Sequence, residues 1–503
     1  MTDSTETTNQ PSTQVSIQLS TRHKDVELPQ DPGIIRIPTA FRRIALSKLV
    51  NSLLETKKPI PFEFLINGQF LRTTLDDFLT ANGISAEEQL TVEYVRAITP
   101  PSQTSTLQHD DWVSSVDVLS ATSQASKWAG GEGIHTGHER ILTGSYDNFL
   151  RIWNMSRETI AISPSPSSGG HTDNINAAKF LSPTRLITSS LDRTIRIWKY
   201  TEDSSNPSSK ASITPSLELY GHRSSVDSLA LHAPTQRILS ASQDTTIGLW
   251  STSKRDAPPA PSSLLPSASL SLSSKRQKTN SAGNAPPASS SYAPQRGPLA
   301  LLTAHTANAS AVIFAPHDPA LAHSTSWDHT LRTWDLPTAR ALSSTPLPAS
   351  LLSLCALPGV GLLAAGSTAR AISLVDSRAG GGSGSGSANL VAMTLRGHAG
   401  PVACLAAGPE EGAGGPWALV SGGFDGTCRV WDVRSVRAGR GSVEGGIGAV
   451  GEESVFVVGR ESEKGTGRVP PADRTKVFGV CWDRDVGILS AGNDNRVQVD
   501  CVG

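Results

Sequence analysis

Cysteine is scarce in this chain, and its few cysteines form no pattern. The 503 residues include five cysteines, all in the second half and without a CxxC pair: Cys355, Cys404, Cys428, Cys481 and Cys501. An odd number without paired spacing argues against a disulfide framework and against a zinc site. We therefore expect a reducing compartment and no intrinsic metal ion.

Excess charge of either sign is also missing. The sequence has 44 Lys and Arg against 45 Asp and Glu, a formal net charge of −1. No global field therefore attracts the chain to nucleic acid or to a membrane surface. Any contact with RNA is predicted to be local or to pass through a partner protein.

Long apolar segments are rare. The first residues, MTDSTETTNQ, have no apolar core of the kind found in a signal peptide. The longest uncharged stretch, Ala349–Gly366, is interrupted by Pro358-Gly359, and its halves fit two buried strands joined by a turn. The sequence predicts a soluble, intracellular protein without a membrane partner.

What the sequence does contain is a repeat: an apolar pair, small residues, Ser or Gly two positions before Asp, and an alternating strand that ends in Trp. The strong copies are ILTGSYDNFLRIWN (Ile141–Asn154), LITSSLDRTIRIWK (Leu186–Lys199), ILSASQDTTIGLWS (Ile238–Ser251), HSTSWDHTLRTWD (His323–Asp335) and LVSGGFDGTCRVWD (Leu419–Asp432). Two weaker copies are LLAAGSTARAISLVD (Leu362–Asp376) and ILSAGNDNRVQVD (Ile488–Asp500). Together they make seven repeated β units.

The spacing within each strong copy is constant. Asp147, Asp192, Asp244, Asp328 and Asp425 each stand six residues before Trp153, Trp198, Trp250, Trp334 and Trp431. A tight turn followed by a strand of that length predicts a hairpin, in which the Asp side chain accepts hydrogen bonds from backbone N–H groups of the turn.

A histidine precedes four of the copies at a loop-to-strand junction: His171, His222, His305 and His398. With the Trp-Asp endings Trp334-Asp335 and Trp431-Asp432, this pattern resembles the WD40 repeat of β-propellers. In that family His, Ser, Asp and Trp form a hydrogen-bonded tetrad in each blade. The resemblance implies the tetrads His171, Ser190, Asp192, Trp198; His222, Ser242, Asp244, Trp250; His305, Ser326, Asp328, Trp334; and, with Gly423 at the Ser position, His398, Asp425, Trp431.

The fifth and seventh copies depart from the tetrad. Blade five has Ala369 and Val375 at the Asp and Trp positions, and blade seven has Asp500 at the Trp position. We expect packing to hold these two blades. The last copy supplies three strands before the chain ends, so we expect residues Thr104–Gln108 to provide its fourth strand and close the ring without exposed edges.

The recurring His, Ser and Asp do not indicate catalysis. A catalytic triad occurs once and lies at a cleft, whereas this set recurs once per repeat at a fixed spacing. The sequence also shows no metal-ligand cluster, cofactor loop or nucleophile motif. We predict a non-enzymatic protein with no catalytic residue and no cofactor of its own.

Two insertions interrupt the repeats. Thr252–Pro298 is rich in Pro, Ser and Ala and is predicted to be disordered, and residues 439–474 separate the sixth and seventh copies. The first insertion contains Lys275, Arg276 and Lys278, a candidate nuclear import signal. A solvated charge cluster explains the same residues equally well.

The pattern changes before the repeats. After a polar tail (residues 1–14, predicted to be disordered), the chain shows alternating strands, a helix signature with Ser47 as N-cap, the Asn67-Gly68 hairpin signal, a short helix capped by Thr74 and a last strand near Leu90–Tyr94. This order resembles the ubiquitin fold over residues 15–98, without a Gly-Gly tail. The predicted fold is therefore mostly β: a small α+β ubiquitin-like domain followed by a seven-bladed WD40 β-propeller over residues 99–503.

A ubiquitin-like domain followed by WD repeats resembles two ribosome-assembly families. One is Notchless, and the other is the WD-repeat subunit of the Pescadillo-containing complex that matures the large ribosomal subunit. The strings PFEFLINGQFLRTTLDDFL, LTVEYVRAITPPS and HDDWVSSVDV match the second family, and seven repeats favour it because Notchless propellers resemble eight-bladed ones. The resemblance implies a scaffold of pre-60S particles in the nucleolus and nucleoplasm, acting in pre-rRNA processing.

The same resemblance implies a mechanism. In these families the ATPase midasin grips the ubiquitin-like domain through a metal-ion-dependent adhesion site, and ATP-driven pulling strips the factor from the particle. An acidic side chain completes the coordination of midasin's Mg²⁺, and the matching residue is Glu87, with the adjacent Glu88 as the alternative. The propeller is expected to bind the block-of-proliferation WD-repeat protein, in one complex with Pescadillo.

A different class of function fits the same domains. WD40 propellers also present substrates to ubiquitin ligases, and a ubiquitin-like domain could then engage a ligase or the proteasome. An apolar patch on the sheet of that domain would favour this adaptor hypothesis over one that depends on Glu87.

Overall fold

A computed structural model describes residues 13–22, 26–55, 58–129, 138–202, 211–265, 293–376, 391–410, 415–434, 449–451, 454–460 and 475–502. The N-terminal part forms one mixed sheet in the strand order β2-β1-β5-β3-β4, with β1 and β5 parallel. Its elements are β1 (Gln14–Ser20), β2 (Ile34–Pro38), α1 (Arg43–Leu53), β3 (Phe62–Ile66), β4 (Gln69–Phe70), α2 (Leu75–Asn82) and β5 (Leu90–Arg96). This is the small α+β domain predicted from the sequence.

Local chemistry explains most of these elements, with one correction. Asn67 and Gly68 both have positive φ in the β3–β4 turn, and the Thr74 hydroxyl caps α2 by accepting from the Asp77 N–H at 3.1 Å. The predicted N-cap Ser47 is wrong, because α1 begins at Arg43. The Ser47 hydroxyl instead accepts from the Phe62 N–H at 3.3 Å and ties the helix to β3.

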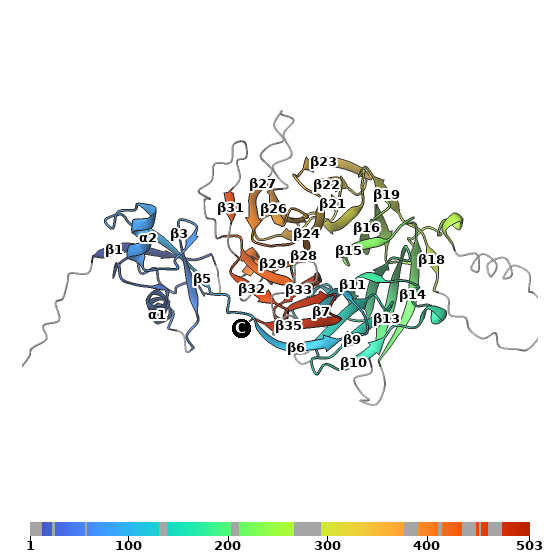
Figure 1. Cartoon of the computed structure of the whole chain (residues 1–503), viewed down its shortest axis with the longest axis horizontal. Coiled ribbons are helices and arrows are strands. Elements are labelled where there is room, and N and C mark those ends of the chain that lie inside the picture. The colour runs from blue at the N-terminus through green and yellow to red at the C-terminus, as the bar shows by residue number, and fades with distance from the viewer. Residues whose placement is uncertain are drawn as a thin grey trace, which may run out of the picture.

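Seven further sheets, each of four or five strands, follow the N-terminal domain in the described residues (Figure 1). Blades one to three contain β7 (Val113–Leu119), β8 (Arg140–Ser145), β9 (Leu150–Trp153), β10 (Thr159–Ile162); β11 (Ile175–Ser182), β12 (Arg185–Ser190), β13 (Thr194–Thr201), β14 (Ser212–Tyr220), β18 (Gln295–Arg296); and β15 (Val226–His232), β16 (Arg237–Ser242), β17 (Thr246–Ser251), β19 (Ala300–Thr303).

Blades four to seven complete the ring. They contain β20 (Ala309–Phe314), β21 (Leu321–Ser326), β22 (Thr330–Asp335), β23 (Arg340–Pro346); β24 (Leu351–Leu357), β25 (Leu362–Ser367), β26 (Ala371–Asp376), β27 (Val391–Arg396), β31 (Ala449–Gly451); β28 (Val402–Ala407), β29 (Ala418–Gly423), β30 (Thr427–Asp432), β32 (Phe456–Gly459); and β33 (Val477–Asp483), β34 (Gly487–Gly492), β35 (Arg496–Cys501), β6 (Ser102–Gln108). The uncharged stretch near residue 350 forms the antiparallel pair β24 and β25.

The ring closes as the sequence predicts. Strand β6, from just after the N-terminal domain, pairs antiparallel with β35 from the end of the chain. Only residues 97–101 separate β5 from β6. Ile98 in this linker is 5% exposed and packs in a cluster with Val430 of blade six and Ile488 of blade seven. The N-terminal domain is therefore joined directly to the strand that closes the propeller (Figure 1).

The insertions differ from expectation. Within Thr252–Pro298, the 3₁₀ helix η3 (Ser262–Leu264) and β18 are formed, and β18 extends blade two by pairing in parallel with β14. Residues 266–292, with Lys275, Arg276 and Lys278, lie outside the described residues. The segment 439–474 is more than a spacer, because β32 is the outer strand of blade six and β31 adds to blade five.

A short helix lies over one end of the central channel. Helix α3 (Gln124–Trp128), in the loop between β7 and β8, lines a cavity of about 630 Å³ together with inner-strand residues of all seven blades. Lys127 Nζ reaches Glu410 Oε2 at 3.0 Å, and the Trp128 ring contacts the His232 ring at a centroid distance of 6.1 Å. The loop thus connects blade one with blades three and six across the channel.

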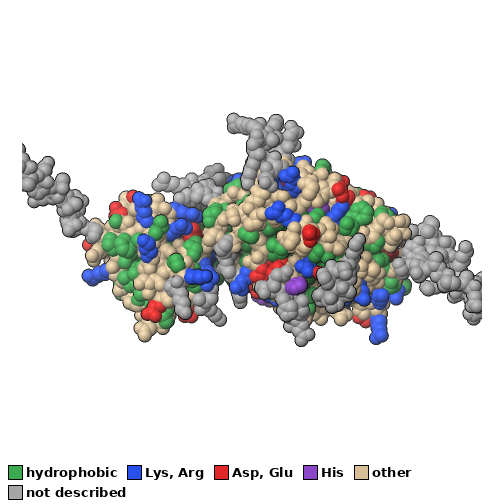
Figure 2. All heavy atoms as spheres, turned by 90° about the horizontal axis from the view of Figure 1, so that it is seen from below, with side chains coloured by type: hydrophobic (Ala, Val, Ile, Leu, Met, Phe, Trp, Pro, Cys, Tyr) green, Lys and Arg blue, Asp and Glu red, His purple; other side chains and the backbone are tan. Residues whose placement is uncertain are grey.

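Two further short helices, η2 (Pro166–Ser168) and η6 (Gly415–Trp417), lie between blade strands. No helix in the described part of the chain is long and apolar enough to cross a membrane. Charged side chains of both signs are interspersed over the face seen in Figure 2, in keeping with the net charge of −1.

Candidate functional site

The turn that carries Glu87 follows helix α2 directly. Gly83 ends the helix in the left-handed conformation (φ 67°), and the Ile84 N–H donates to the Leu79 carbonyl at 3.0 Å. Ile84 and Ala86 then pack against the core of the domain. The apolar residues therefore anchor the turn while the next two residues, Glu87 and Glu88, are exposed.

Ser85 fixes the backbone of this turn. The Glu87 N–H donates to the Ser85 hydroxyl at 3.3 Å, and the Glu88 N–H donates to the Ser85 carbonyl at 3.2 Å. Gln89 Nε2 donates to Gln18 Oε1 at 3.1 Å and links the end of the turn to β1. Both glutamate side chains extend from an ordered backbone into solvent, so either carboxylate is available to a partner.

A single carboxylate is chemically suited to a metal held elsewhere. Mg²⁺ requires near-octahedral oxygen coordination, and one side chain supplies only one or two of those ligands. Within the described residues no group of three His, Cys, Asp or Glu side chains is placed to hold a metal ion. The geometry leaves Glu87 and Glu88 equivalent in exposure, and the choice of Glu87 remains a prediction.

The repeated histidines form buried networks in four blades. In blade two, His171 Nδ1 lies 2.7 Å from Asp192 Oδ2, and its Nε2 lies 2.7 Å from the Thr188 hydroxyl, which also accepts from Trp198 Nε1 at 2.8 Å. A neutral histidine protonated on Nδ1 satisfies every group in this chain of hydrogen bonds. The same arrangement joins His222, Ser240, Asp244, Trp250; His305, Ser324, Asp328, Trp334; and His398, Ser421, Asp425, Trp431.

These contacts correct the predicted hydroxyl residues. Ser190, Ser242 and Ser326 do not join His to Trp; the residue two positions earlier does, and in blade six Ser421 fills the role that the sequence assigned to a missing residue at Gly423. The predicted serines lie at the strand ends. There Ser190 accepts from the Asp192 N–H at 3.1 Å and donates to the Asp173 carbonyl at 3.0 Å. They belong to the turn rather than to the network.

Electrostatics agrees with a structural role. Burial lowers the pKa of His171 and His305. Burial alone would raise the pKa of the paired carboxyls, but the contacts with the histidine and with neighbouring hydroxyl and N–H groups outweigh it. The pKa values of Asp192, Asp244, Asp328 and Asp425 therefore lie well below the ordinary range. The networks of His171 and His305 thus each hold a carboxylate and a neutral imidazole inside a blade, away from solvent.

The remaining blades use other residues. In blade one, His109 and Trp153 share the Thr143 hydroxyl at 2.9 and 3.0 Å, while Asp147 pairs with Arg151 at 2.5 Å. The sequence signal for His109 is its spacing, because it stands four residues before its strand as the other histidines do.

In blade seven, the prediction that packing alone holds the blade is wrong. Arg460, 2% exposed, takes the place of the histidine and donates to the Ser490 hydroxyl and carbonyl, both at 2.8 Å. It also forms an ion pair with Asp494. No sequence signal identified Arg460, because it lies within the segment 439–474, which has no repeat pattern.

We expect Thr188→Val to destabilise the propeller by about 1–3 kcal/mol, because it leaves buried nitrogens of His171 and Trp198 without a partner. The matched control is Ser189→Ala. The Ser189 hydroxyl is buried and has no hydrogen-bond partner among the described residues, so its loss should change stability by less than about 0.5 kcal/mol. All ten tryptophans lie after residue 111, so denaturant unfolding followed by tryptophan fluorescence reports on the propeller. Equal effects of the two substitutions would contradict the assignment of Thr188.

Comparison with known proteins gives two family models and a set of full-length relatives. The NLE (NUC135) domain model matches residues 15–79. The WD domain, G-beta repeat model matches residues 101–154, 163–199, 213–251, 296–335 and 390–432, which are the five strong copies. The chain is 51% identical over 497 residues to "Ribosome biogenesis protein YTM1" of Ajellomyces capsulatus, covering 99% of this chain and 95% of that protein. It is 52% identical over 491 residues to "Ribosome biogenesis protein ytm1" of Aspergillus terreus, covering 97% and 96%.

Proposed function

We propose a function from one premise, that this chain belongs to the YTM1 family of ribosome biogenesis proteins. The family is non-enzymatic, and the buried, repeated histidine networks agree with that. We propose that the chain is a scaffold for maturation of the large ribosomal subunit and for pre-rRNA processing on pre-60S particles, in the nucleolus and nucleoplasm. The adaptor alternative lacks comparable support, because the full-length relatives are ribosome biogenesis proteins.

The proposed partners are those that the domain order implies. The propeller docks on the block-of-proliferation WD-repeat protein, in one complex with Pescadillo, and the ubiquitin-like domain is the handle for midasin. Glu87 completes the coordination of Mg²⁺ held by midasin's adhesion site. The observation that carries this proposal is the turn itself, in which Ser85 and Ile84 fix the backbone and leave the Glu87 carboxylate exposed.

The linker supports a role in removal. Residues 97–101 are too short to act as a flexible tether, and Ile98 is buried against blades six and seven. A pull on the ubiquitin-like domain therefore acts on β6, the strand that closes the ring, rather than being absorbed in loose chain. Force applied at the handle would reach the propeller and its docked partner directly.

The test is binding of the full chain to midasin's adhesion-site domain, with Mg²⁺ and with chelator. Glu87→Gln keeps the shape of the side chain and removes its charge. We expect at least a 30-fold loss of affinity, the equivalent of about 2 kcal/mol, and no further loss on chelation.

The matched control is Glu55→Gln, an exposed glutamate just after α1 of the same domain, which should bind as wild type does. If Glu88→Gln gives the loss and Glu87→Gln does not, the ligand is Glu88. Wild-type binding that survives chelation would refute the metal-dependent mechanism.

A further inference from the structure

Blade five lacks every member of the histidine network. At the four positions that hold His, Ser or Thr, Asp and Trp in other blades, it has Leu347, Ala365, Ala369 and Val375. Leu347, Ala365 and Val375 are buried in one apolar cluster with side chains of blade four. Packing therefore replaces the network here, but with smaller side chains than those it replaces.

The substitutions open space over Ser373 in β26. In blade three, the matching position is Gly248, and a Cβ atom there would lie 2.5 Å from the Trp250 indole nitrogen, so the tryptophan ring covers this position. In blade two, the matching residue is Arg196, which pairs with Glu218 at 3.1 Å. Blade five has no ring here, because Val375 stands at the Trp position. It has no ion pair here either, because Ser373 faces Thr394 across the β26–β27 ladder.

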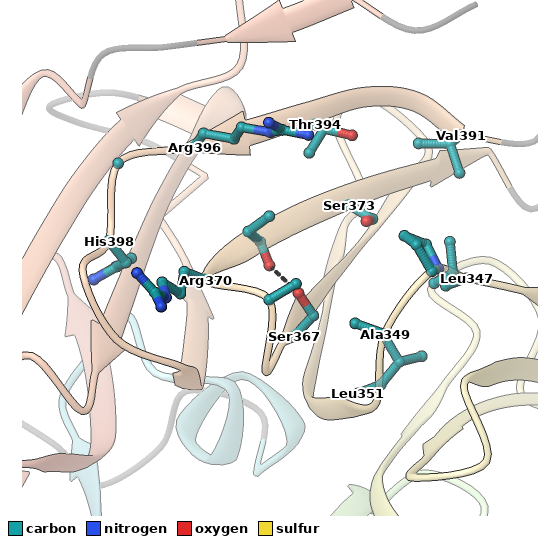
Figure 3. A pocket seen from close by; sticks show the side chains of 14 residues that line it. Leu347, Ala349, Leu351, Ser367, Arg370, Ser373, Val391, Thr394, Arg396 and His398 are labelled. Atoms are coloured by element: carbon teal, nitrogen blue, oxygen red, sulfur yellow. Dashed lines mark hydrogen bonds between the residues drawn. The ribbon is translucent and has the colours of Figure 1, made fainter. Parts of the chain in front are cut away.

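A pocket of about 470 Å³ occupies this space (Figure 3). One end is apolar, with Leu347, Ala349 and Leu351, and Arg370 and Arg396 lie toward the other end. Both arginines are exposed, and neither forms an ion pair among the described residues. Among the described residues that line the pocket there is no Asp or Glu, so these do not neutralise its positive charge.

We propose that this pocket binds a segment of a protein partner in which an aromatic side chain stands beside acidic residues. The aromatic ring takes the place that a tryptophan ring fills in blades two, three, four and six, against the same surface of the sheet. The acidic residues pair with Arg370 and Arg396 at the rim. Aromatic anchors in partly closed pockets with charged rims are typical of binding hot spots, and the volume is that of a ligand pocket rather than a packing defect.

The charge and shape favour a peptide over a nucleic acid. Two arginines at one end provide few phosphate contacts, whereas an apolar end lined by leucine side chains gains free energy by burying an apolar ring. The pocket is lined mainly by residues of blade five, with Gly397 and His398 at the start of blade six, and is independent of the proposed role of Glu87.

The test uses the full chain and a fluorescein-labelled ten-residue peptide with one Trp followed by three Asp in a Gly/Ser background. Fluorescence anisotropy should show saturable binding that is weakened at least tenfold when the peptide Trp is replaced by Ala. The variant R370E/R396E should also weaken binding at least tenfold. The variant S373R/T394E recreates the blade-two ion pair inside the pocket and should abolish binding.

Arg193 provides the matched control. It is exposed and occupies the same turn position in blade two, with φ 70° against 64° for Arg370, but it lies beside a complete network. The variant R193E should bind as wild type does. Thermal unfolding of S373R/T394E identical to wild type would show that lost binding does not reflect misfolding.

The proposal is overturned if no peptide binds, if S373R/T394E binds as tightly as wild type, or if R193E weakens binding as much as R370E/R396E. It is also overturned if a single-stranded RNA of ten uridines displaces the peptide while the Trp-to-Ala peptide binds unchanged. In that case the arginines form a general anion site.

Discussion

Arg460→Ala should destabilise the propeller by about 3–5 kcal/mol, a larger loss than we expect for Thr188→Val. Arg460 is 2% exposed, and its guanidinium donates to the Ser490 carbonyl and hydroxyl at 2.8 Å and to the Arg496 carbonyl at 2.7 Å, besides pairing with Asp494. Its removal takes the guanidinium partner from the largely buried Asp494 carboxylate and one donor each from the Ser490 hydroxyl and the two carbonyls. Denaturant unfolding followed by tryptophan fluorescence measures the loss.

The position of Arg460 predicts which strands are destabilised first. The residue directly follows β32, the outer strand of blade six, and its side chain lies inside blade seven. Loss of the side chain therefore loosens the seam at which β35 pairs with β6. Hydrogen exchange should accelerate first in β34 and β35, before the blades that keep histidine networks.

A double-mutant cycle separates the ion pair from packing. Asp494→Asn removes the partner charge. We expect the double variant R460M/D494N to lose at least about 1 kcal/mol less stability than the summed losses of the single variants R460M and D494N. That difference is the coupling energy of the ion pair. Arg434→Ala provides the comparison, because Arg434 pairs with the buried Asp432 in blade six and lies over the Trp417 ring, without contacting the strands of blade seven that Arg460 joins. A loss below about 1 kcal/mol for Arg460→Ala would mean that packing holds blade seven, as the sequence alone predicted.

The repeat made the propeller predictable because each blade carries its own local signals. The Asp-to-Trp spacing fixes a hairpin, and seven such hairpins require a ring whose last sheet lacks one strand. Residues 104–108 were the simplest source, and β6 is that strand. The ubiquitin-like fold was predictable for a similar reason, since Asn67-Gly68 and the Thr74 cap each determine one local turn.

The wrong predictions concern tertiary contacts that the spacing of residues along the sequence does not determine. Ser190 and Thr188 lie on the same face of one strand, and only the position of the tryptophan and histidine rings determines which hydroxyl joins them. Arg460 reaches blade seven from a segment without repeat pattern, so its role depends on tertiary structure alone. Likewise, Ser47 has the sequence features of an N-cap, but α1 begins at Arg43, and the Ser47 hydroxyl accepts from the Phe62 N–H of β3 instead.

Blade five shows where sequence and structure agree and where the structure adds more. The absence of Asp and Trp predicted packing in place of the network, and the apolar cluster around Leu347 and Val375 confirms it. No sequence signal indicated the pocket, because a cavity depends on the summed volumes of residues from three separate segments. The sequence pattern shows that blade five lacks the family's network residues, whereas only the packed structure shows the pocket that their absence leaves.

Acidification should destabilise the propeller through buried neutral histidines, and His323 is the clearest case. The ring is 3% exposed, bonds to the Thr333 hydroxyl through Nδ1 at 3.1 Å, and burial lowers its pKa to about 4. The unfolded chain binds a proton near pH 6.5, so the stabilisation is complete above that pH and is lost as the pH falls toward 4. Between pH 7 and 4.5 this single group should cost about 2–3 kcal/mol.

Other groups titrate over the same range with both signs, so a difference between variants is needed to isolate His323. Burial lowers the pKa of His109 to about 4 and adds to the loss, whereas burial raises the pKa of Asp117 to about 6 and opposes it, since protonation then favours the folded state. His323→Asn removes one titrating group and leaves these two in place. The free energy of unfolding of the variant should therefore fall by about 2–3 kcal/mol less than that of wild type between pH 7 and 4.5. The control is His317→Asn, at an exposed histidine of the same blade, whose stability should vary with pH as that of wild type does. If the free energy of unfolding of His323→Asn runs parallel to wild type over this pH range, His323 does not stay neutral in the folded protein.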